Sequence, residues 1–153
     1  MKANKIMLGD WVNYRPGWID EETGEPVFDS KKGFPVKIDF IGGEDGGAQY
    51  SDEYGSYEMA DFEMSPIPLT PEILEKNGFE IVSARDDNAG TMEKYFYPRI
   101  GYVYRFSNGE WEVDLIGYGR GFSGAAKYRG VICSVHELQH ALRLCGIEKE
   151  IVL

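Results

Sequence analysis

The sequence predicts an α+β protein with more strand than helix, and three observations lead to this prediction. The 153 residues include ten Tyr, eight Phe, three Trp and 19 Gly, a composition typical of strands and turns. Short alternating runs separated by turn residues fill the first half of the chain. Helix-start signals stand out near residue 70 and near residue 134. We therefore expect short strands throughout, with two helices.

Residues 1–65 are predicted to form a small SH3-like β-barrel module. The segment 8–14 enters a strand through a Gly-Asp turn, and residues 34–41 alternate before a Gly-Gly pair. Residues 20–32 are polar and indicate a loop or an extended hairpin, whereas 57–64 indicates a further short strand. Several short strands joined by many turns favour such a barrel. A loose meander on a larger sheet is the alternative.

Residues 66–78 are predicted to be a proline-rich junction that ends in a short helix. Thr70 suits the N-cap position, and Pro71 suits the first turn, where its missing N–H costs nothing. Asn77-Gly78 is typical of a helix end. In this interpretation the segment connects two modules and carries no site.

Residues 79–153 are predicted to form an antiparallel sheet packed by the last helix. Asn108-Gly109 is a strong hairpin signal. With these two residues as the loop, one apolar face would contain the pairs Phe106–Trp111, Tyr104–Val113 and Tyr102–Leu115. Further strands are expected at 79–84 and 94–97, a helix from Ser134 to Cys145, and a terminal strand at 147–153.

The only two histidines form an H-E-x-x-H sequence, His136-Glu137-Leu138-Gln139-His140. On a helix, His136 and His140 share a face and can hold zinc, with Glu137 placed as general base for a metal-bound water. This pattern indicates a zinc-dependent hydrolase as one alternative.

A structural role for the same residues is the favoured interpretation. Ser134 and Glu137 fit a capping box, in which the Ser134 hydroxyl bonds the Glu137 amide and the carboxylate reaches back to the Ser134 amide. A catalytic zinc also needs a third protein ligand, and an upstream ligand such as Asp114 stays open. We therefore expect no catalytic residue, no metal ligand and no cofactor, and the prediction leans away from an enzyme.

The acidic charge is uneven. The net charge is −10, and residues 1–76 carry 16 acidic and 7 basic side chains. Such a surface repels the nucleic-acid backbone, so we do not expect nucleic acid as a partner. Two alternatives stay open: an acidic surface that imitates DNA, and tyrosines interleaved with arginines that stack on single strands. The second set includes Tyr97, Arg99, Tyr118, Arg120 and Arg129.

The aromatic residues of the N-terminal half are the expected contact region for a protein partner, because Trp and Tyr are common interface anchors. The candidate interface residues are Trp18, Tyr14, Tyr50 and Tyr54. No run of apolar residues reaches the length of a membrane helix, so we expect a cytoplasmic protein without membrane contact.

Three blocks of the chain resemble an uncharacterised family of small proteins from Bacteroides-type bacteria and their phages and mobile elements. The blocks are residues 8–12, residues 67–74 with Asn77-Gly78-Phe79, and residues 135–139. The resemblance implies no activity, cofactor or catalytic residue. It implies the context of a mobile element, and we expect a non-enzymatic accessory or interaction protein.

Overall fold

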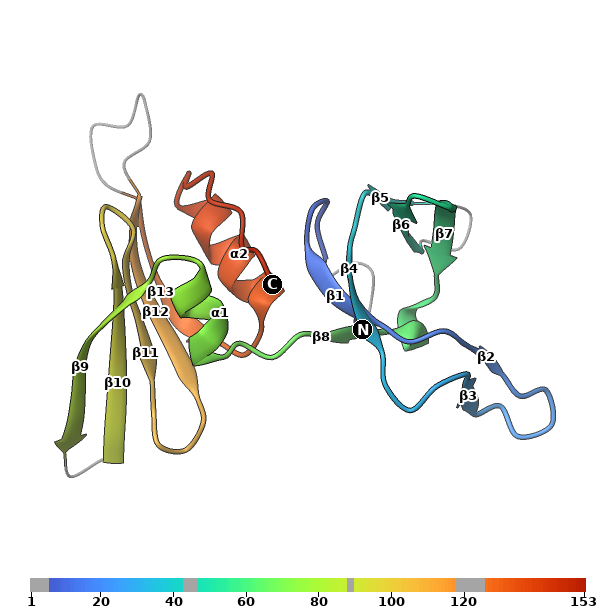
Figure 1. The fold of residues 1–153 in the computed structure, drawn as a ribbon, viewed down its shortest axis with the longest axis horizontal. Helices are drawn as coiled ribbons and strands as arrows, with labels where there is room; N and C mark the ends of the chain where they lie inside the picture. Colours follow the sequence, from blue (N-terminus) through green and yellow to red (C-terminus); the bar gives the residue numbers. More distant parts are fainter. Residues whose placement is uncertain (1–5, 43–46, 88–89, 118–125) are drawn as a thin grey trace. The chain divides into compact units, whose positions relative to one another are not determined.

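The computed structural model describes residues 6–42, 47–87, 90–117 and 126–153. The chain divides into two compact units, Met1–Ile67 and Pro68–Leu153, which are coloured blue to green and green to red in Figure 1. Strands dominate both units, and two α-helices belong to the second. The expected α+β class is confirmed in this mainly-β form.

The N-terminal unit contains three small antiparallel sheets. The first has the order β4-β1-β8, the second pairs β2 with β3, and the third has the order β5-β6-β7. The strands are β1 (Trp11–Tyr14), β2 (Gly17–Ile19), β3 (Pro26–Phe28), β4 (Phe34–Lys37), β5 (Phe40–Ile41), β6 (Ala48–Asp52), β7 (Gly55–Met59) and β8 (Met64–Pro66). Among the described residues these pairings do not close into one barrel, so the SH3-like barrel stays a prediction.

One core joins the first and third sheets of this unit. It is built from residues of β1, β4, β6, β7 and β8, namely Val12, Tyr14, Val36, Ala48, Tyr50, Met59 and Met64, together with Ile6 and Ile38. The expected strand at 34–41 is interrupted inside this core. The Ile38 amide donates to the Asp10 carbonyl, whereas the Asp39 amide donates to the Gln49 carbonyl. The chain therefore passes from one sheet to the other at Ile38-Asp39.

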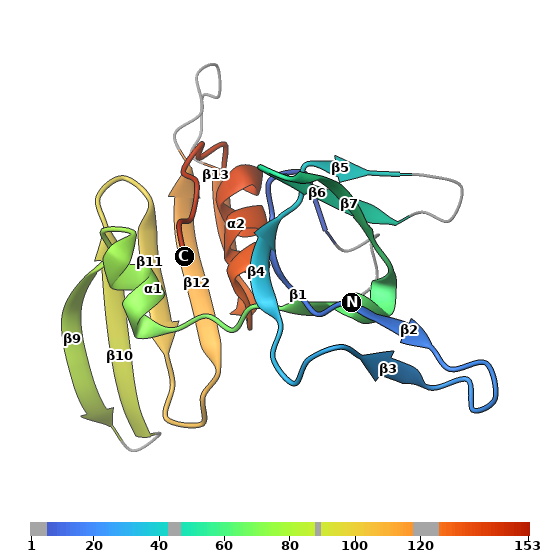
Figure 2. The same ribbon diagram turned by 45° about the vertical axis from the view of Figure 1, so that its right-hand side comes forward.

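The C-terminal unit is a five-stranded antiparallel sheet with the order β13-β12-β11-β10-β9. Its strands are β9 (Glu80–Asp87), β10 (Gly90–Tyr97), β11 (Gly101–Arg105), β12 (Trp111–Gly117) and β13 (Ala126–Ile132). The helices are α1 (Pro71–Lys76) and α2 (Val135–Leu144). Helix α2 packs against β12 and β13. Figures 1 and 2 show both helices on the same side of the sheet.

The short helix forms as its sequence predicts. The Thr70 hydroxyl accepts a hydrogen bond from the Ile73 amide, and Pro71 occupies the first turn. Leu74 is fully buried and fixes the helix on its unit. The helix ends at Asn77-Gly78, where Gly78 has a φ of +78°, a conformation that glycine adopts without a steric penalty.

The predicted hairpin exists, but the expected pairing is wrong by one residue. Tyr104 pairs with Glu112 and Tyr102 with Asp114, because Phe106 bonds Glu110 across a three-residue loop, Ser107-Asn108-Gly109. Gly109 has a φ of +86°, as a three-residue loop with a left-handed last residue requires. The shift moves Tyr102 and Tyr104 to the face opposite the buried Val103 and Val113.

The expected terminal strand at 147–153 is also wrong, because these residues form no strand. Ile151 is fully buried and anchors the segment. The side chain of Asn77 takes the place of a neighbouring strand, since it donates to the Val152 carbonyl and accepts from the Val152 amide.

Candidate functional site

The H-E-x-x-H residues lie on α2, and its two histidines are adjacent. The ring centroids of His136 and His140 are 5.7 Å apart. The Nδ1 atom of His136 lies 2.9 Å from the Ser134 hydroxyl, and His136 is only 5% exposed. The helical spacing therefore brings the imidazoles together as the pattern predicts.

The hydrogen bonds at the start of this helix differ from the expected capping box, so that prediction is wrong. Ser134 makes no side-chain cap, because its hydroxyl donates to the Glu137 carboxylate at 3.0 Å. The same carboxylate oxygen accepts from the Cys133 amide at 2.6 Å. Glu137 still has a structural role, since it ties the chain before the helix to the first turn.

A third metal ligand is missing from the described part of the chain, where no group of three potential ligand side chains occurs. Asp114 lies between Val113 and Leu115, which are fully buried. Because side chains alternate along a strand, Asp114 is on the opposite face of the sheet. It therefore does not complete a site with His136 and His140.

The four candidate interface residues fall into two groups. Trp18 and Tyr54 are 52% and 82% exposed, whereas Tyr14 and Tyr50 are 9% and 7% exposed and belong to the core. Tyr54 lies in the β6–β7 turn, which the Asp52 carboxylate holds by accepting from the Tyr54 and Gly55 amides. The two buried tyrosines lie in an aromatic cluster.

That aromatic cluster consists of Tyr14, Phe34, Tyr50 and Tyr57. Tyr50 stacks on Tyr57 with centroids 5.1 Å apart, and Tyr14 contacts Tyr50 at 5.3 Å and Phe34 at 5.4 Å. Phe34 and Tyr57 are 44% and 38% exposed. The two inner rings therefore support two outer rings whose surfaces are open.

Negative charges act on the inner rings of the aromatic cluster. Burial raises the pKa of Tyr14, and the negative charges of Glu63 and Asp29 raise it further. Burial also raises the pKa of Tyr50, and Asp52 adds to the effect. The same charges that oppose ionisation of a tyrosine attract a cation.

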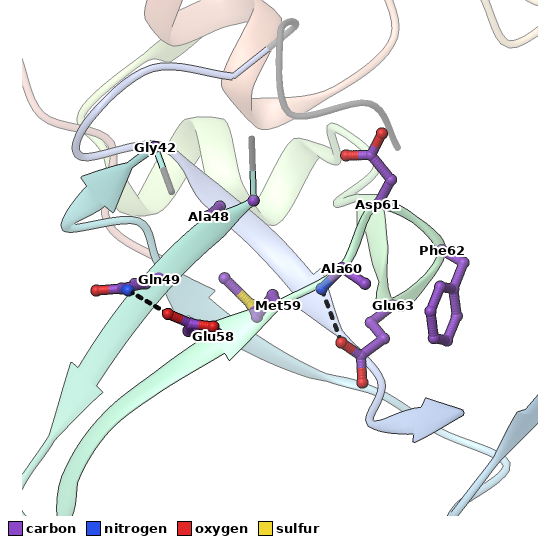
Figure 3. Close-up of a pocket in the computed structure, with 10 residues that line it drawn as sticks. Gly42, Ala48, Gln49, Glu58, Met59, Ala60, Asp61, Phe62 and Glu63 are labelled. Atoms are coloured by element: carbon purple, nitrogen blue, oxygen red, sulfur yellow. Dashed lines mark hydrogen bonds between the residues drawn. The ribbon is translucent and has the colours of Figure 1, made fainter. Parts of the chain in front are cut away.

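A hollow in the same unit has a volume of about 730 Å³ and is shown in Figure 3. It contains three carboxylates, those of Glu58, Asp61 and Glu63. Glu58 accepts from Gln49 at 2.9 Å, and Glu63 accepts from the Ala60 amide at 2.8 Å and the Gly17 amide at 2.9 Å. The carboxylates of Glu58 and Glu63 are therefore already engaged in hydrogen bonds within the protein.

The Tyr/Arg set from the sequence does not gather in one described place. Tyr97 and Arg99 lie at the β10–β11 turn, Arg129 pairs with Glu112, and Tyr118 and Arg120 lie outside the described residues. Neither α1 nor α2 has the length and apolar character needed to cross a bilayer.

Comparison with protein families, curated proteins and solved structures finds no match to this chain. The site is therefore defined by its own residues. Sequence reasoning missed Phe34 and Tyr57 as surface residues of the aromatic cluster. The signal was available in the alternation of Tyr57 with Met59 and of Tyr50 with Ala48, which places all four on one face.

Proposed function

We propose that this protein is a non-enzymatic interaction protein, an accessory protein of a mobile element, and that its aromatic cluster binds a cationic, extended segment of a partner protein. The observation that supports this most is the open pair Phe34 and Tyr57 on buried Tyr14 and Tyr50. Rigid, half-exposed aromatic rings are typical anchors of protein interfaces.

Charge favours a basic partner. Residues 1–67 carry 14 acidic and 6 basic side chains, and Asp29, Asp52 and Glu63 act on the inner tyrosines. An arginine stacks its guanidinium on an aromatic ring and gains from nearby negative charge. Proline-rich segments in the polyproline II conformation dock on aromatic-lined surfaces. We therefore commit to a segment rich in proline and arginine.

The proposal includes the finer fold of the N-terminal unit, an SH3-like barrel. Two sheets that share one core, β4-β1-β8 and β5-β6-β7, support this assignment. Such barrels commonly present aromatic rings between their loops. In this unit the rings of Phe34 and Tyr57 come from β4 and β7.

Isothermal titration calorimetry of the full chain with a short Pro/Arg peptide tests the proposal. We expect binding at low salt that weakens as salt rises, because exposed charges are screened. Tyr57→Ala and Phe34→Ala are each expected to weaken binding by about tenfold or more, as loss of an interface anchor does.

Matched controls distinguish binding at the aromatic cluster from nonspecific binding. Tyr54→Ala removes a more exposed tyrosine outside the aromatic cluster and is expected to leave affinity unchanged. A peptide with glutamate in place of every arginine is expected not to bind. Circular dichroism establishes that each variant is folded. Absence of binding by the folded parent chain at low salt, or equal affinity of all three variants, would contradict the proposal.

A further inference from the structure

The second face of the C-terminal sheet carries an aromatic row that no helix of the described chain covers. Residues directly opposite in a sheet share a face. Lys94 pairs with Tyr104, and Phe96 pairs with Tyr102, so these four share one face. Their neighbours Tyr95 and Val103 are 1% and 0% exposed on the other face, and both helices lie on one side of the sheet (Figures 1 and 2).

The rings of this row are close enough to form one surface. The centroids of Phe96 and Tyr102 are 5.1 Å apart, and those of Tyr102 and Tyr104 are 6.1 Å apart. All three side chains are half-buried. The row crosses β10 and β11, and β11 is the central strand of the sheet. We call Lys94, Phe96, Tyr102 and Tyr104 the aromatic row.

A cation lies within the aromatic row. The Lys94 Nζ atom lies 3.8 Å from the Tyr102 ring centroid and 5.6 Å from that of Tyr104. No carboxylate of the described residues forms an ion pair with it. On the strands β12 and β13, Glu112 forms an ion pair with Arg129, whose Nε atom lies 2.5 Å from the Glu112 Oε1 atom. Asp114 and Glu112 lie opposite Tyr102 and Tyr104 on the same face, and Glu80 lies opposite Phe96. The Lys94 ammonium is thus the cation that contacts the rings, and carboxylates border them.

The two units differ in their net charge. Residues 68–153 carry 12 acidic and 10 basic side chains, whereas residues 1–67 carry 14 and 6. The repulsion expected of a strongly acidic chain therefore comes mainly from the N-terminal unit. The C-terminal unit as a whole is close to neutral.

We infer that the aromatic row binds single-stranded nucleic acid, independently of the interface proposed for the N-terminal unit. Unpaired bases stack on aromatic side chains of open antiparallel sheets, and a cation beside the rings contacts the linking phosphate. Phe96, Tyr102 and Tyr104 supply the stacking surfaces, and Lys94 supplies the phosphate contact. The bordering carboxylates predict weak binding with little sequence preference.

Fluorescence polarisation of the full chain with labelled oligo-uridine and oligo-thymidine at low salt tests this inference. We expect both to bind, with any preference between them identifying RNA or DNA as the better ligand. Tyr102→Ala is expected to weaken binding by about tenfold, as loss of one stacking platform does. Lys94→Ala is expected to lower the salt slope by about one.

Three further measurements separate base stacking from unspecific effects of substitution and from self-association. Tyr102→Phe keeps the ring and is expected to bind like the parent chain. Leu144→Ala changes an exposed residue on α2 and is expected to have no effect. Sedimentation velocity reports whether a second copy covers the row instead. The inference would be overturned if neither oligonucleotide binds, or if Tyr102→Ala binds as tightly as the parent chain. It would also be overturned if the parent chain forms a dimer that Tyr102→Ala dissociates.

Discussion

Asn77 holds the C-terminal segment by a two-way contact with Val152. Its Nδ2 atom donates to the Val152 carbonyl at 2.7 Å, and its Oδ1 atom accepts from the Val152 amide at 2.9 Å. The same Nδ2 atom donates to the Ile73 carbonyl at 2.8 Å. Asn77 is 6% exposed, so water does not replace these bonds.

Asn77→Ala is therefore expected to lower the free energy of unfolding by about 2 kcal/mol, since each lost hydrogen bond contributes roughly 0.5–1.5 kcal/mol. Urea unfolding followed by circular dichroism measures the change. Glu148→Ala alters an exposed residue of the same segment and is expected to change the free energy little. Equal stability of the two variants would show that the segment is held in another way.

Arg99 is a residue whose replacement is expected to stabilise the protein. It has a φ of +66° in a turn closed by the Ile100 amide and the Tyr97 carbonyl, with Pro98 before it. This conformation costs a residue with a Cβ about 1–2 kcal/mol. Arg99→Gly is expected to raise the free energy of unfolding by roughly 0.5–1 kcal/mol, after the added freedom of the unfolded chain is subtracted.

Arg99→Ala is the matched control for this change, because it removes the charge and keeps the Cβ atom. Thermal unfolding of both variants separates the two effects. If Arg99→Ala stabilises as much as Arg99→Gly, the cause is the charge and not the conformation of the backbone.

Tyr95 makes the stability of the folded protein depend on pH in the alkaline range. Burial and the hydrogen bond to Glu93 raise its pKa to about 12. The unfolded chain loses the proton near pH 10, so the folded state binds more protons above that pH. Stability is complete below pH 10 and falls as pH rises toward 12, by up to about 1.4 kcal/mol per pH unit.

Tyr95→Phe is expected to flatten this decline, and Tyr54→Phe at an exposed position is not. Urea unfolding at a series of pH values from neutral to alkaline measures both slopes. A Tyr95→Phe protein that loses stability as steeply as the parent chain would refute the assignment.

The two histidines of α2 are expected to bind no stoichiometric zinc, since the described residues offer them no third ligand. Elemental analysis of protein purified without a histidine tag measures the metal content. We expect the same low content in the parent chain and in His140→Ala. One zinc per chain in the parent, lost in His140→Ala, would restore the hydrolase alternative.

Local signals in the sequence were sufficient to predict an element at positions where one residue type determines the backbone conformation. Thr70, Pro71 and Asn77-Gly78 predicted α1 because each fills a position that few residues suit. The Asn108-Gly109 pair predicted a hairpin, but it fits loops of two or three residues. The register depends on this choice, and the sequence alone did not decide it.

Long-range contacts account for the other differences. The alternation of Ile147 to Ile151 predicted a strand, but Asn77 from another part of the chain satisfies the backbone of Val152. The aromatic cluster joins Phe34 to Tyr57 through tyrosines of two sheets. Such a surface depends on how sheets pack, which periodicity within one strand does not report.

The aromatic cluster is the centre of the proposed function, and nuclear magnetic resonance of its rings during titration with the Pro/Arg peptide tests it most directly. We predict that the ring resonances of Phe34 and Tyr57 shift progressively to saturation, while those of Tyr54 stay in place. The proposed interface would be contradicted if the ring resonances of Phe34 and Tyr57 do not shift at saturating peptide concentration.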